Sequence, residues 1–175
     1  MKSPIQSTKT DQGFSLTELM IAVVILGILG AAALPQYFNQ VQKTRQNEAA
    51  ASVSQIQTTI AAFVDEMGLL PVSWSDLNKI TPLMTPKGPA NQSNFSAINL
   101  ASTGCTESQQ SHCYQVDASQ RNQVFTLNAR SRNREAAAFN VVACLDLRTG
   151  ATDLKKGTNQ NAATVDQLRC IRSTG

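Results

Sequence analysis

Charged side chains are scarce in this sequence, since Asp, Glu, Lys and Arg make up only 15% of its 175 residues, against roughly 25% in an ordinary soluble domain. The formal net charge is +3 and the basic residues are scattered, which excludes a strongly basic nucleic-acid-binding module on composition alone. Aromatic residues make up 5% of the chain, so an aromatic-rich core is not expected. With His112 as the only histidine and no glycine-rich phosphate-binding loop, we expect neither an enzyme nor a bound cofactor.

Charge is missing altogether between Glu18 and Lys43, and this stretch holds the long hydrophobic run of the chain. Residues 19–35 contain 14 hydrophobic residues out of 17. As a helix, residues 14–33 would cover about 30 Å, which is enough to cross a bilayer. The first thirteen residues are polar and include Lys2 and Lys9, so the positive-inside rule places the N-terminus in the cytoplasm and the rest of the chain outside it.

Ordinary signal-peptide cleavage is one interpretation of this run, because residues 31–33 are three alanines that can form a signal peptidase site. Two features argue against it. Glu18 lies inside the apolar segment, where a carboxylate costs roughly 2.5–3.5 kcal/mol on insertion scales. The helical pattern also continues well beyond the run instead of ending after it.

Residues 13–18 read GFSLTE and precede an apolar stretch that contains Gly27 and Pro35. This segment resembles the class III signal of type IV pilins and their relatives, and the resemblance covers about residues 13–45. It implies that a prepilin peptidase cuts between Gly13 and Phe14 on the cytoplasmic side and methylates the new amino terminus. Cleavage would leave 175 − 13 = 162 residues.

Simple chemistry is consistent with these implied roles. Gly13 has no Cβ, so a protease can approach its backbone closely, and cleavage frees a positively charged amine on Phe14. Glu18 lies four residues after that amine and can pair with the amine of a neighbouring subunit in a fibre, which favours assembly and fixes the axial register. The alternative for Glu18 is a carboxylate at the level of the lipid headgroups, within reach of water.

Gly27, Gly30 and Pro35 weaken the helix, by up to about 1 kcal/mol for each glycine and about 3 kcal/mol for the proline relative to alanine. Small residues permit close helix packing in a membrane. In type IV pilins the corresponding stretch is described as melting when the subunit enters the fibre. The sequence is consistent with both interpretations.

One helix is predicted over about residues 15–67, kinked near Pro35. Its second half carries an apolar stripe with helical spacing, formed by Val53, Ile56, Ile60, Phe63, Val64 and Met67. Polar residues are expected largely off this stripe, namely Lys43, Arg45, Gln46, Gln57 and Asp65. Gly68 is placed to end the helix, with Pro71 shortly after.

The remainder predicts an antiparallel sheet that packs on this helix. Residues 68–112 are rich in Pro, Gly, Asn and Ser and are expected to form an irregular connection, with a short helix over residues 75–80. Period-two patterns predict strands at residues 113–117, 123–129 and 138–147. One face of the second strand carries Phe125, Leu127 and Ala129, and one face of the third carries Phe139, Val141, Ala143, Leu145 and Leu147. The fold class is therefore α+β, with a pilin-like long helix covered by a meander.

Four cysteines lie in the exported part, and an even number in an oxidising compartment predicts two disulfides. Of the three pairings we prefer Cys105–Cys113 and Cys144–Cys170, because each joins sequence neighbours. The second would tie the C-terminal tail to the outward face of the sheet, stabilise the fold by about 3 kcal/mol, and resemble the disulfide-bounded C-terminal region of many type IV pilins. The alternative, a metal site of Cys105, His112 and Cys113, is disfavoured by its irregular spacing and single histidine.

Basic residues concentrate at one point of the head. Arg130, Arg132 and Arg134 alternate with Ser131 and Asn133 at a predicted hairpin tip, with Arg121 expected close to them. A solvated loop is the simpler interpretation. The functional one is contact with DNA phosphates, as in pilins that capture DNA for uptake, although no aromatic residues interleave to stack on single strands.

The domain organisation expected from these features has three parts: a leader (1–13), the transmembrane or fibre-core half of the helix (14–42), and an exported head (43–175). The head comprises helix 43–67, connection 68–112, and a sheet with a disulfide-tied tail over 113–175.

The expected function is a pilin precursor of the inner membrane that is polymerised into an extracellular pilus for adhesion, twitching motility or DNA uptake. Its expected partners are other pilin subunits, the prepilin peptidase, the inner-membrane assembly machinery and, in the DNA-binding interpretation, DNA. The alternatives are a type II secretion pseudopilin, a minor pilin whose head binds DNA or a surface, and an unrelated signal-anchored exported domain.

Overall fold

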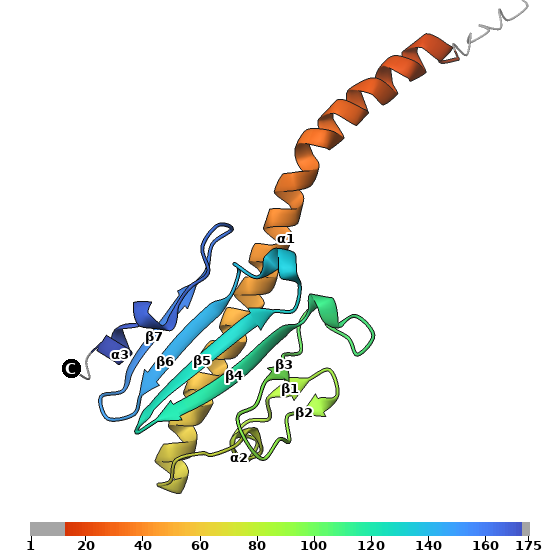
Figure 1. The fold of residues 1–175 in the computed structure, drawn as a ribbon. Helices are drawn as coiled ribbons and strands as arrows, with labels where there is room; N and C mark the ends of the chain where they lie inside the picture. Colours follow the sequence, from red (N-terminus) through yellow and green to blue (C-terminus); the bar gives the residue numbers. More distant parts are fainter. Residues whose placement is uncertain (1–12, 173–175) are drawn as a thin grey trace, which may run out of the picture. The chain divides into compact units, whose positions relative to one another are not determined.

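A computed structural model describes residues 13–172 of the chain (Figure 1). It begins with a long helix, α1 (Leu16–Met67), and continues with short elements that lead into a sheet. In order these are α2 (Trp74–Leu77), β1 (Met84–Thr85), β2 (Gly88–Pro89), β3 (Ile98–Asn99), η1 (Gln110–His112), β4 (Tyr114–Arg121), β5 (Val124–Ser131), η2 (Arg134–Ala136), β6 (Val141–Asp146), β7 (Ala151–Lys156), η3 (Val165–Gln167) and α3 (Arg169–Arg172). The predicted α+β layout of one long helix and an antiparallel sheet is confirmed.

The chain divides into two compact units, one up to Phe38 and the other from Asn39 onward. Helix α1 contributes to both, and its predicted extent agrees with the structure. It ends where expected, because Gly68 adopts a left-handed conformation with φ of 67° and its N–H donates to the carbonyl of Val64 at 2.9 Å. The kink at Pro35 stays a prediction.

The second unit is built on the apolar stripe of α1. Ala49, Val53, Ile56, Ile60 and Phe63 are buried and belong to the main hydrophobic core. Met67 is an exception to the predicted stripe, since it is 44% exposed. Asp65 and Glu66 beside it are also exposed, whereas Val64 is partly buried.

Two glutamines correct the sequence-based expectation, which put them off the stripe. Gln46 is 5% exposed and Gln57 is 7% exposed. Their side-chain amides donate to backbone carbonyls of the sheet: Gln46 to Asn140 and Gly157, and Gln57 to Cys144. Burial of a polar side chain is tolerated when it is hydrogen-bonded, and here the two glutamines fix where the helix lies along the sheet.

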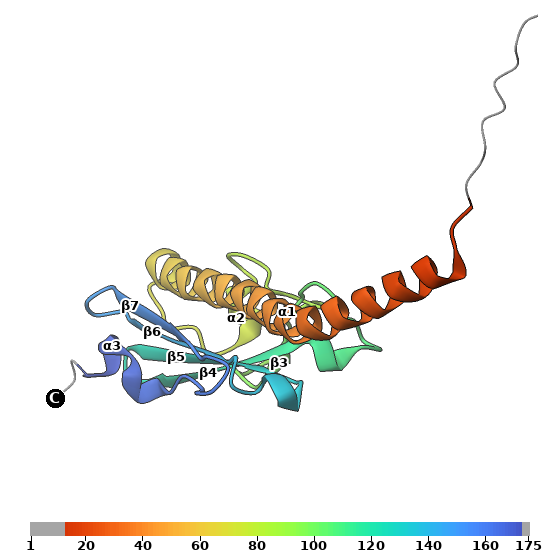
Figure 2. The ribbon, with the colours of Figure 1, turned by 90° about the horizontal axis from the view of Figure 1, so that it is seen from above.

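The main sheet has the order β3-β4-β5-β6-β7, and every neighbouring pair is antiparallel. This is the expected meander, and α1 covers one of its faces while α3 lies on the other side (Figure 2). Phe125 pairs with Leu145 and Leu127 with Ala143, so the inward residues of β5 and β6 meet in the core.

The strand boundaries differ from the predicted ones in instructive ways. Strands β4 and β5 are longer than expected and form a continuous hairpin, whose turn includes Asn122 with φ of 57°. The third predicted strand, over 138–147, is shortened at both ends to β6, and the N–H of Phe139 bonds instead to the carbonyl of Ala136 in a turn. Strands β3 and β7, and the small β1–β2 hairpin, were not expected.

The connection between α1 and β4 is more ordered than its composition predicted. The predicted short helix is α2, which starts one residue earlier than expected and is capped by the hydroxyl of Ser73. Trp74 is fully buried and its indole N–H donates to the carbonyl of Ser96 at 2.7 Å. Phe95 contacts both Trp74 and Phe125 edge to face, with ring centroids 5.0 Å and 5.9 Å apart. The few aromatic residues are therefore concentrated where the connection meets the sheet.

Candidate functional site

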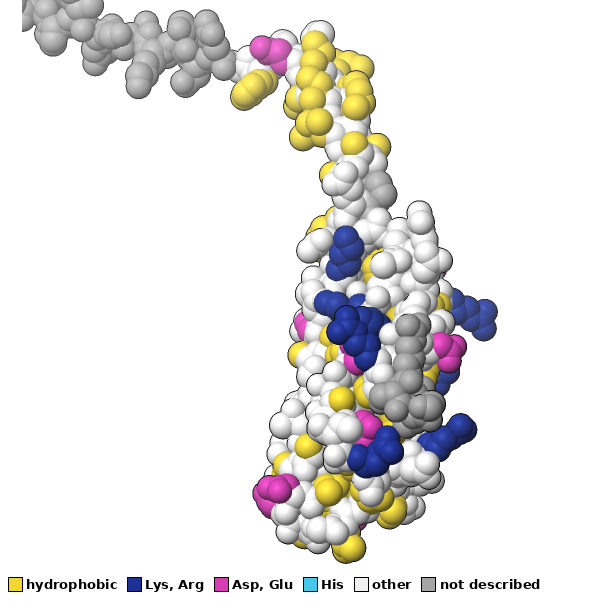
Figure 3. All heavy atoms as spheres, turned by 90° about the vertical axis from the view of Figure 1, so that its left-hand side faces the viewer, with side chains coloured by type: hydrophobic (Ala, Val, Ile, Leu, Met, Phe, Trp, Pro, Cys, Tyr) yellow, Lys and Arg dark blue, Asp and Glu magenta, His cyan; other side chains and the backbone are white. Residues whose placement is uncertain are grey.

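The N-terminal part of α1 presents an uncovered hydrophobic surface (Figure 3). Every described side chain of residues 13–40 is exposed, although the segment is almost wholly apolar. Among the described residues, α1 is the one helix that is long and apolar enough to cross a membrane, judged by length and composition. Such a large apolar surface marks a membrane or protein contact.

The start of this surface is shaped by a reciprocal cap between Ser15 and Glu18. The hydroxyl of Ser15 accepts a hydrogen bond from the Glu18 N–H at 3.2 Å, and the Glu18 carboxylate accepts one from the Ser15 N–H at 2.9 Å. This capping box satisfies two otherwise unpaired donors, and a carboxylate in the first turn is favourable next to the positive end of the helix dipole. The cap uses Oε2 of Glu18, so Oε1 stays available to another donor.

The predicted scissile bond lies just outside the helix. Gly13 and Phe14 precede α1 in non-helical conformation, and the Phe14 side chain is 91% exposed. No heavy atom of the described residues lies within 4 Å of the position that a Cβ on Gly13 would occupy. The bond is therefore sterically open to an enzyme, while the rest of the leader, with Lys2 and Lys9, lies outside the described residues.

The glycines of α1 have no packing role within the chain. Neither Gly27 nor Gly30 has a heavy atom within 4 Å of the position that a Cβ would occupy. Pro35 lies within the helix, although it has no N–H to donate to the carbonyl four residues before it. Any benefit of the two glycines therefore lies in contacts outside the described residues or in the flexibility of the helix.

The structure pairs the cysteines as the sequence analysis prefers. Cys105 bonds Cys113 with a Cα–Cα distance of 4.7 Å, and Cys144 bonds Cys170 with one of 6.2 Å. The sulfurs of Cys105 and Cys113 are thus bonded to each other instead of to a metal ion, and His112 directly precedes Cys113 in the sequence. Cys144 points to the outer face of the sheet, where it forms a second hydrophobic cluster with Val142, Ala163, Leu168 and Cys170.

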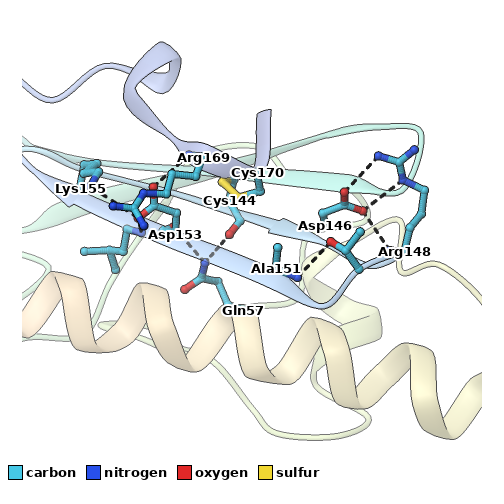
Figure 4. Close-up of a disulfide and its surroundings, with 11 residues drawn as sticks. Gln57, Cys144, Asp146, Arg148, Ala151, Asp153, Lys155, Arg169 and Cys170 are labelled. Carbon is cyan, nitrogen blue, oxygen red and sulfur yellow. Dashed lines mark hydrogen bonds and ion pairs between the residues drawn. A yellow bond between two sulfur atoms is a disulfide. The ribbon is translucent and has the colours of Figure 1, made fainter. Parts of the chain in front are cut away.

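A polar clamp that the sequence analysis missed holds the same tail. The Asn140 side chain exchanges two hydrogen bonds with the backbone of Ala163, at 2.7 Å and 2.8 Å. Gly157 donates its N–H to the Asn140 carbonyl at 2.9 Å, and its own carbonyl accepts from Gln46 at 2.8 Å. The backbone N–H of Arg169 lowers the pKa of Asp153 by hydrogen bonding to its carboxylate. Figure 4 shows the region of the disulfide.

The arginines expected to form one cluster do not do so. Arg121 pairs with Val124 at the β4–β5 turn, whereas Arg130 pairs with Gln115, so about 20 Å of strand separates them. Arg130 also forms an ion pair with Asp117 at 2.7 Å. Arg132 and Arg134 are exposed in the β5–β6 connection, not at a hairpin tip. DNA contact by these residues stays a prediction, and Arg121 is not part of the same surface.

Comparison with known proteins finds similarity at the N-terminal end. A family model described as the prokaryotic N-terminal methylation motif matches residues 8–34. The chain is 37% identical over 71 residues to the type IV major fimbrial protein FimA of Dichelobacter nodosus, which is 39% of this chain and 46% of that protein. It is 41% identical over 58 residues to a fimbrial protein of Pseudomonas aeruginosa, covering 33% and 38% of the two chains.

A longer match is with fimbrial protein Q of Moraxella bovis, at 31% identity over 92 residues, or 51% of this chain and 59% of that protein. The chain thus spans between about two fifths and three fifths of the length of these relatives. No solved structure matches it. In its N-terminal segment, which carries the methylation motif and the exposed apolar helix, the chain is similar to type IV pilins.

Proposed function

We propose that this chain is a pilin precursor, a structural subunit that is cut between Gly13 and Phe14, methylated on the new amine and polymerised into an extracellular pilus. The observation that carries the proposal is the uncovered apolar stretch of α1 with a single carboxylate, Glu18, at its start. No enzymatic step is assigned to the chain, since its predicted role is to form a fibre.

Before assembly, the apolar part of α1 crosses the inner membrane. Lys2 and Lys9 precede it and no charged residue follows until Lys43, which favours a cytoplasmic N-terminus and an exported head. The open Gly13–Phe14 bond then faces the cytoplasm, where a prepilin peptidase of the inner membrane can reach it.

In the fibre, the Phe14 amine of one subunit pairs with Glu18 of a neighbour. An isolated carboxylate in lipid is costly, roughly 2.5–3.5 kcal/mol on insertion scales, and an opposite charge relieves this cost. The capping bond from Ser15 leaves one carboxylate oxygen of Glu18 without a hydrogen bond among residues 13–172, which supports a second, intersubunit donor. The pairing stabilises the subunit where it meets its neighbour and sets the axial register.

Gly27, Gly30 and Pro35 let the helix adjust as it leaves lipid for the fibre. The open surroundings of the two glycines support this proposal, because no contact with the described residues requires a glycine at either position. Replacing both glycines with alanine would raise helix stability by about 1 kcal/mol per site. It should therefore slow or reduce assembly without affecting the head.

Fibres sheared from the surface of cells that make the full chain provide the test. Glu18→Gln keeps the size and most of the capping geometry but removes the charge, and should lower the recovered chain strongly. Glu107→Gln, at another exposed glutamate, is the matched control and should assemble normally. Abundant recovery of the unmodified chain indicates a major pilin, and trace recovery a minor one. Its absence from fibres, together with loss of protein secretion on deletion, indicates a pseudopilin and contradicts the proposal.

A further inference from the structure

Hydrogen bonds from two glutamines of α1 to the sheet show which end of the second unit each part of the helix lies at. Gln46 bonds to the carbonyls of Asn140 and Gly157, where β6 begins and β7 finishes. Gln57 bonds to the carbonyl of Cys144, midway along β6. Lys43 therefore lies at the first of these ends and Asp65 beyond the other, near the β6–β7 turn. The 22 residues between them span about 33 Å of helix.

The end near Lys43, here called the basic end, gathers positive charge from three parts of the chain. Lys156 at the end of β7 donates to Asn47 at 3.1 Å, and Asn47 lies one helical turn after Lys43. Burial raises the pKa of Tyr114 to about 12, and the charge of Arg45 opposes this rise, which places Arg45 near the start of β4.

Arg132 and Arg134 complete the basic end, because Tyr114 pairs with Ser131 directly before them. Both are exposed and without an ion pair in the described part of the chain. Carboxylates near the five cations of the basic end include Glu48 and Glu135. Figure 3 shows basic side chains spread along the side of the head that it displays, with acidic side chains among them.

The other end, here called the acidic end, has the opposite character. The last turn of α1 has no basic residue and carries Asp65 and Glu66, both exposed and without an ion pair among the described residues. A helix C-terminus bears partial negative charge and normally favours cations. The nearby cations are engaged, since Lys79 pairs with Asp76 and Arg148 with Asp146.

An open groove of about 690 Å³ runs between α1 and the β6–β7 turn, and Asp65 lies along it. Its walls include Ala61, Val64 and Leu147, together with the hydroxyls of Thr58 and Thr152. Gln57 also lines it: the Nε2 of Gln57 is bonded to the sheet, while its Oε1 accepts no hydrogen bond from the described chain (Figure 4).

The groove therefore combines apolar walls with oxygen acceptors. Lys and Arg side chains have this complementary chemistry, because an aliphatic stem carries a head that only donates hydrogen bonds. Nearly buried Gln57, which lines the groove, is a polar feature separate from the exposed carboxylates and favours the same kind of occupant.

We propose that the acidic end and its groove receive the basic end of a second copy of this chain. The inference rests on the proposed function, which supplies neighbouring copies in a fibre. A contact between two different surfaces of identical subunits is head to tail, and such contacts generate an open filament rather than a closed dimer. Charge complementarity between the ends selects this register and disfavours two like ends meeting.

Charge reversal in the full chain tests the contact, with recovery of sheared fibres as the measurement. Asp65→Lys and Lys156→Glu should each lower recovery about fivefold or more, as expected for loss of an intersubunit charge pair. The double variant restores opposite charges across the contact and should recover to within about twofold of the unmodified chain. Glu107→Lys makes the same change in net charge at another exposed site and should leave recovery unchanged.

A second measurement separates assembly from folding. Lysine at a helix C-terminus is favourable, so the purified full chain in detergent should unfold no earlier with Asp65→Lys than without it. Normal recovery with Asp65→Lys, or no rescue in the double variant, overturns the inference while the proposed function stands. Absence of the unmodified chain from fibres overturns the proposed function, and the inference with it.

Discussion

Replacement of Gly157 by alanine should destabilise the head severely, because this position has no room for a side chain. A Cβ there would lie 2.0 Å from the carbonyl oxygen of Ala138 and 2.5 Å from Oδ1 of Asn140. Relief requires either the backbone or the Asn140 side chain to move, and the latter breaks both hydrogen bonds to Ala163.

The magnitude follows from two contributions. Inserting a methyl group into a packed site costs about 1–3 kcal/mol, and each buried polar group left unpaired costs about 1–3 kcal/mol. Taking the middle of both ranges and one group left unpaired, the free energy of unfolding should fall by about 4 kcal/mol. This loss exceeds the effect of any single exposed contact in the head.

Urea denaturation of a fragment starting at Asn39, followed by the fluorescence of the single, fully buried Trp74, measures the change. With a slope of about 2 kcal/mol per molar, the midpoint should fall by about 2 M. Gly150→Ala is the control, since Gly150 has φ of 69° but open space around it, and should cost only about 1–2 kcal/mol. A midpoint for Gly157→Ala no lower than that of Gly150→Ala would refute the argument.

Two further predictions concern the tail and acid stability. Replacing Cys144 and Cys170 by serine should lower the free energy of unfolding by about 3 kcal/mol, because the disulfide closes a loop of 26 residues. The C-terminal tail should then become sensitive to protease. Peptide mapping of the native protein checks the disulfide pairing itself. Hydrogen bonds from the side chain of Arg148, and then from its backbone N–H, hold the pKa of Asp146 below its usual 3.8. The ionised carboxylate therefore stabilises the fold above about pH 4. This stabilisation is lost as the pH falls through the lowered pKa. Asp146→Asn should therefore be less stable at pH 7, with a difference that shrinks toward pH 2 in acid titration; an unchanged difference contradicts this assignment.

Helix α1 and the meander could be predicted because their signals are local and repetitive. The apolar stripe has helical spacing over several turns, and β5 and β6 alternate strictly between the core and the outer face. The GFSLTE motif is likewise a contiguous signal that needs no tertiary context.

Strand β7 escaped prediction because it is an edge strand whose sequence, ATDLKK, places only Leu154 against the core. It is a strand because it forms hydrogen bonds to β6. The hydrophobic pattern of its own residues does not indicate that such a neighbouring strand is present. Strand β3 is two residues long and offers no period to detect.

The buried glutamines were missed for a different reason. Gln46 and Gln57 occupy the covered side of α1 by helical phase, next to Ala49, Val53 and Ile60, but their polarity argued for the surface. Only the sheet supplies the carbonyls that make their burial favourable. Spacing alone, taken without regard to polarity, was the signal that could have found them.

The dispersal of Arg121 and Arg130 shows the limit of sequence distance as a guide. Nine residues separate them, yet the hairpin places them at opposite ends of β4 and β5. Register decides such proximity, and the length of β4 and β5 was underestimated from their patterns. By contrast, the disulfides were a choice among only three pairings of four cysteines.

The central claim is that this chain is processed as a pilin, and the N-terminus of the mature protein tests it most directly. Intact mass and N-terminal sequencing of protein purified from the membrane or from fibres should find 162 residues beginning at Phe14, with one methyl group on its amine. A Gly13→Val variant should retain the leader. A mature chain that begins at any other residue, including one cut after the alanines at residues 31–33, would contradict the account.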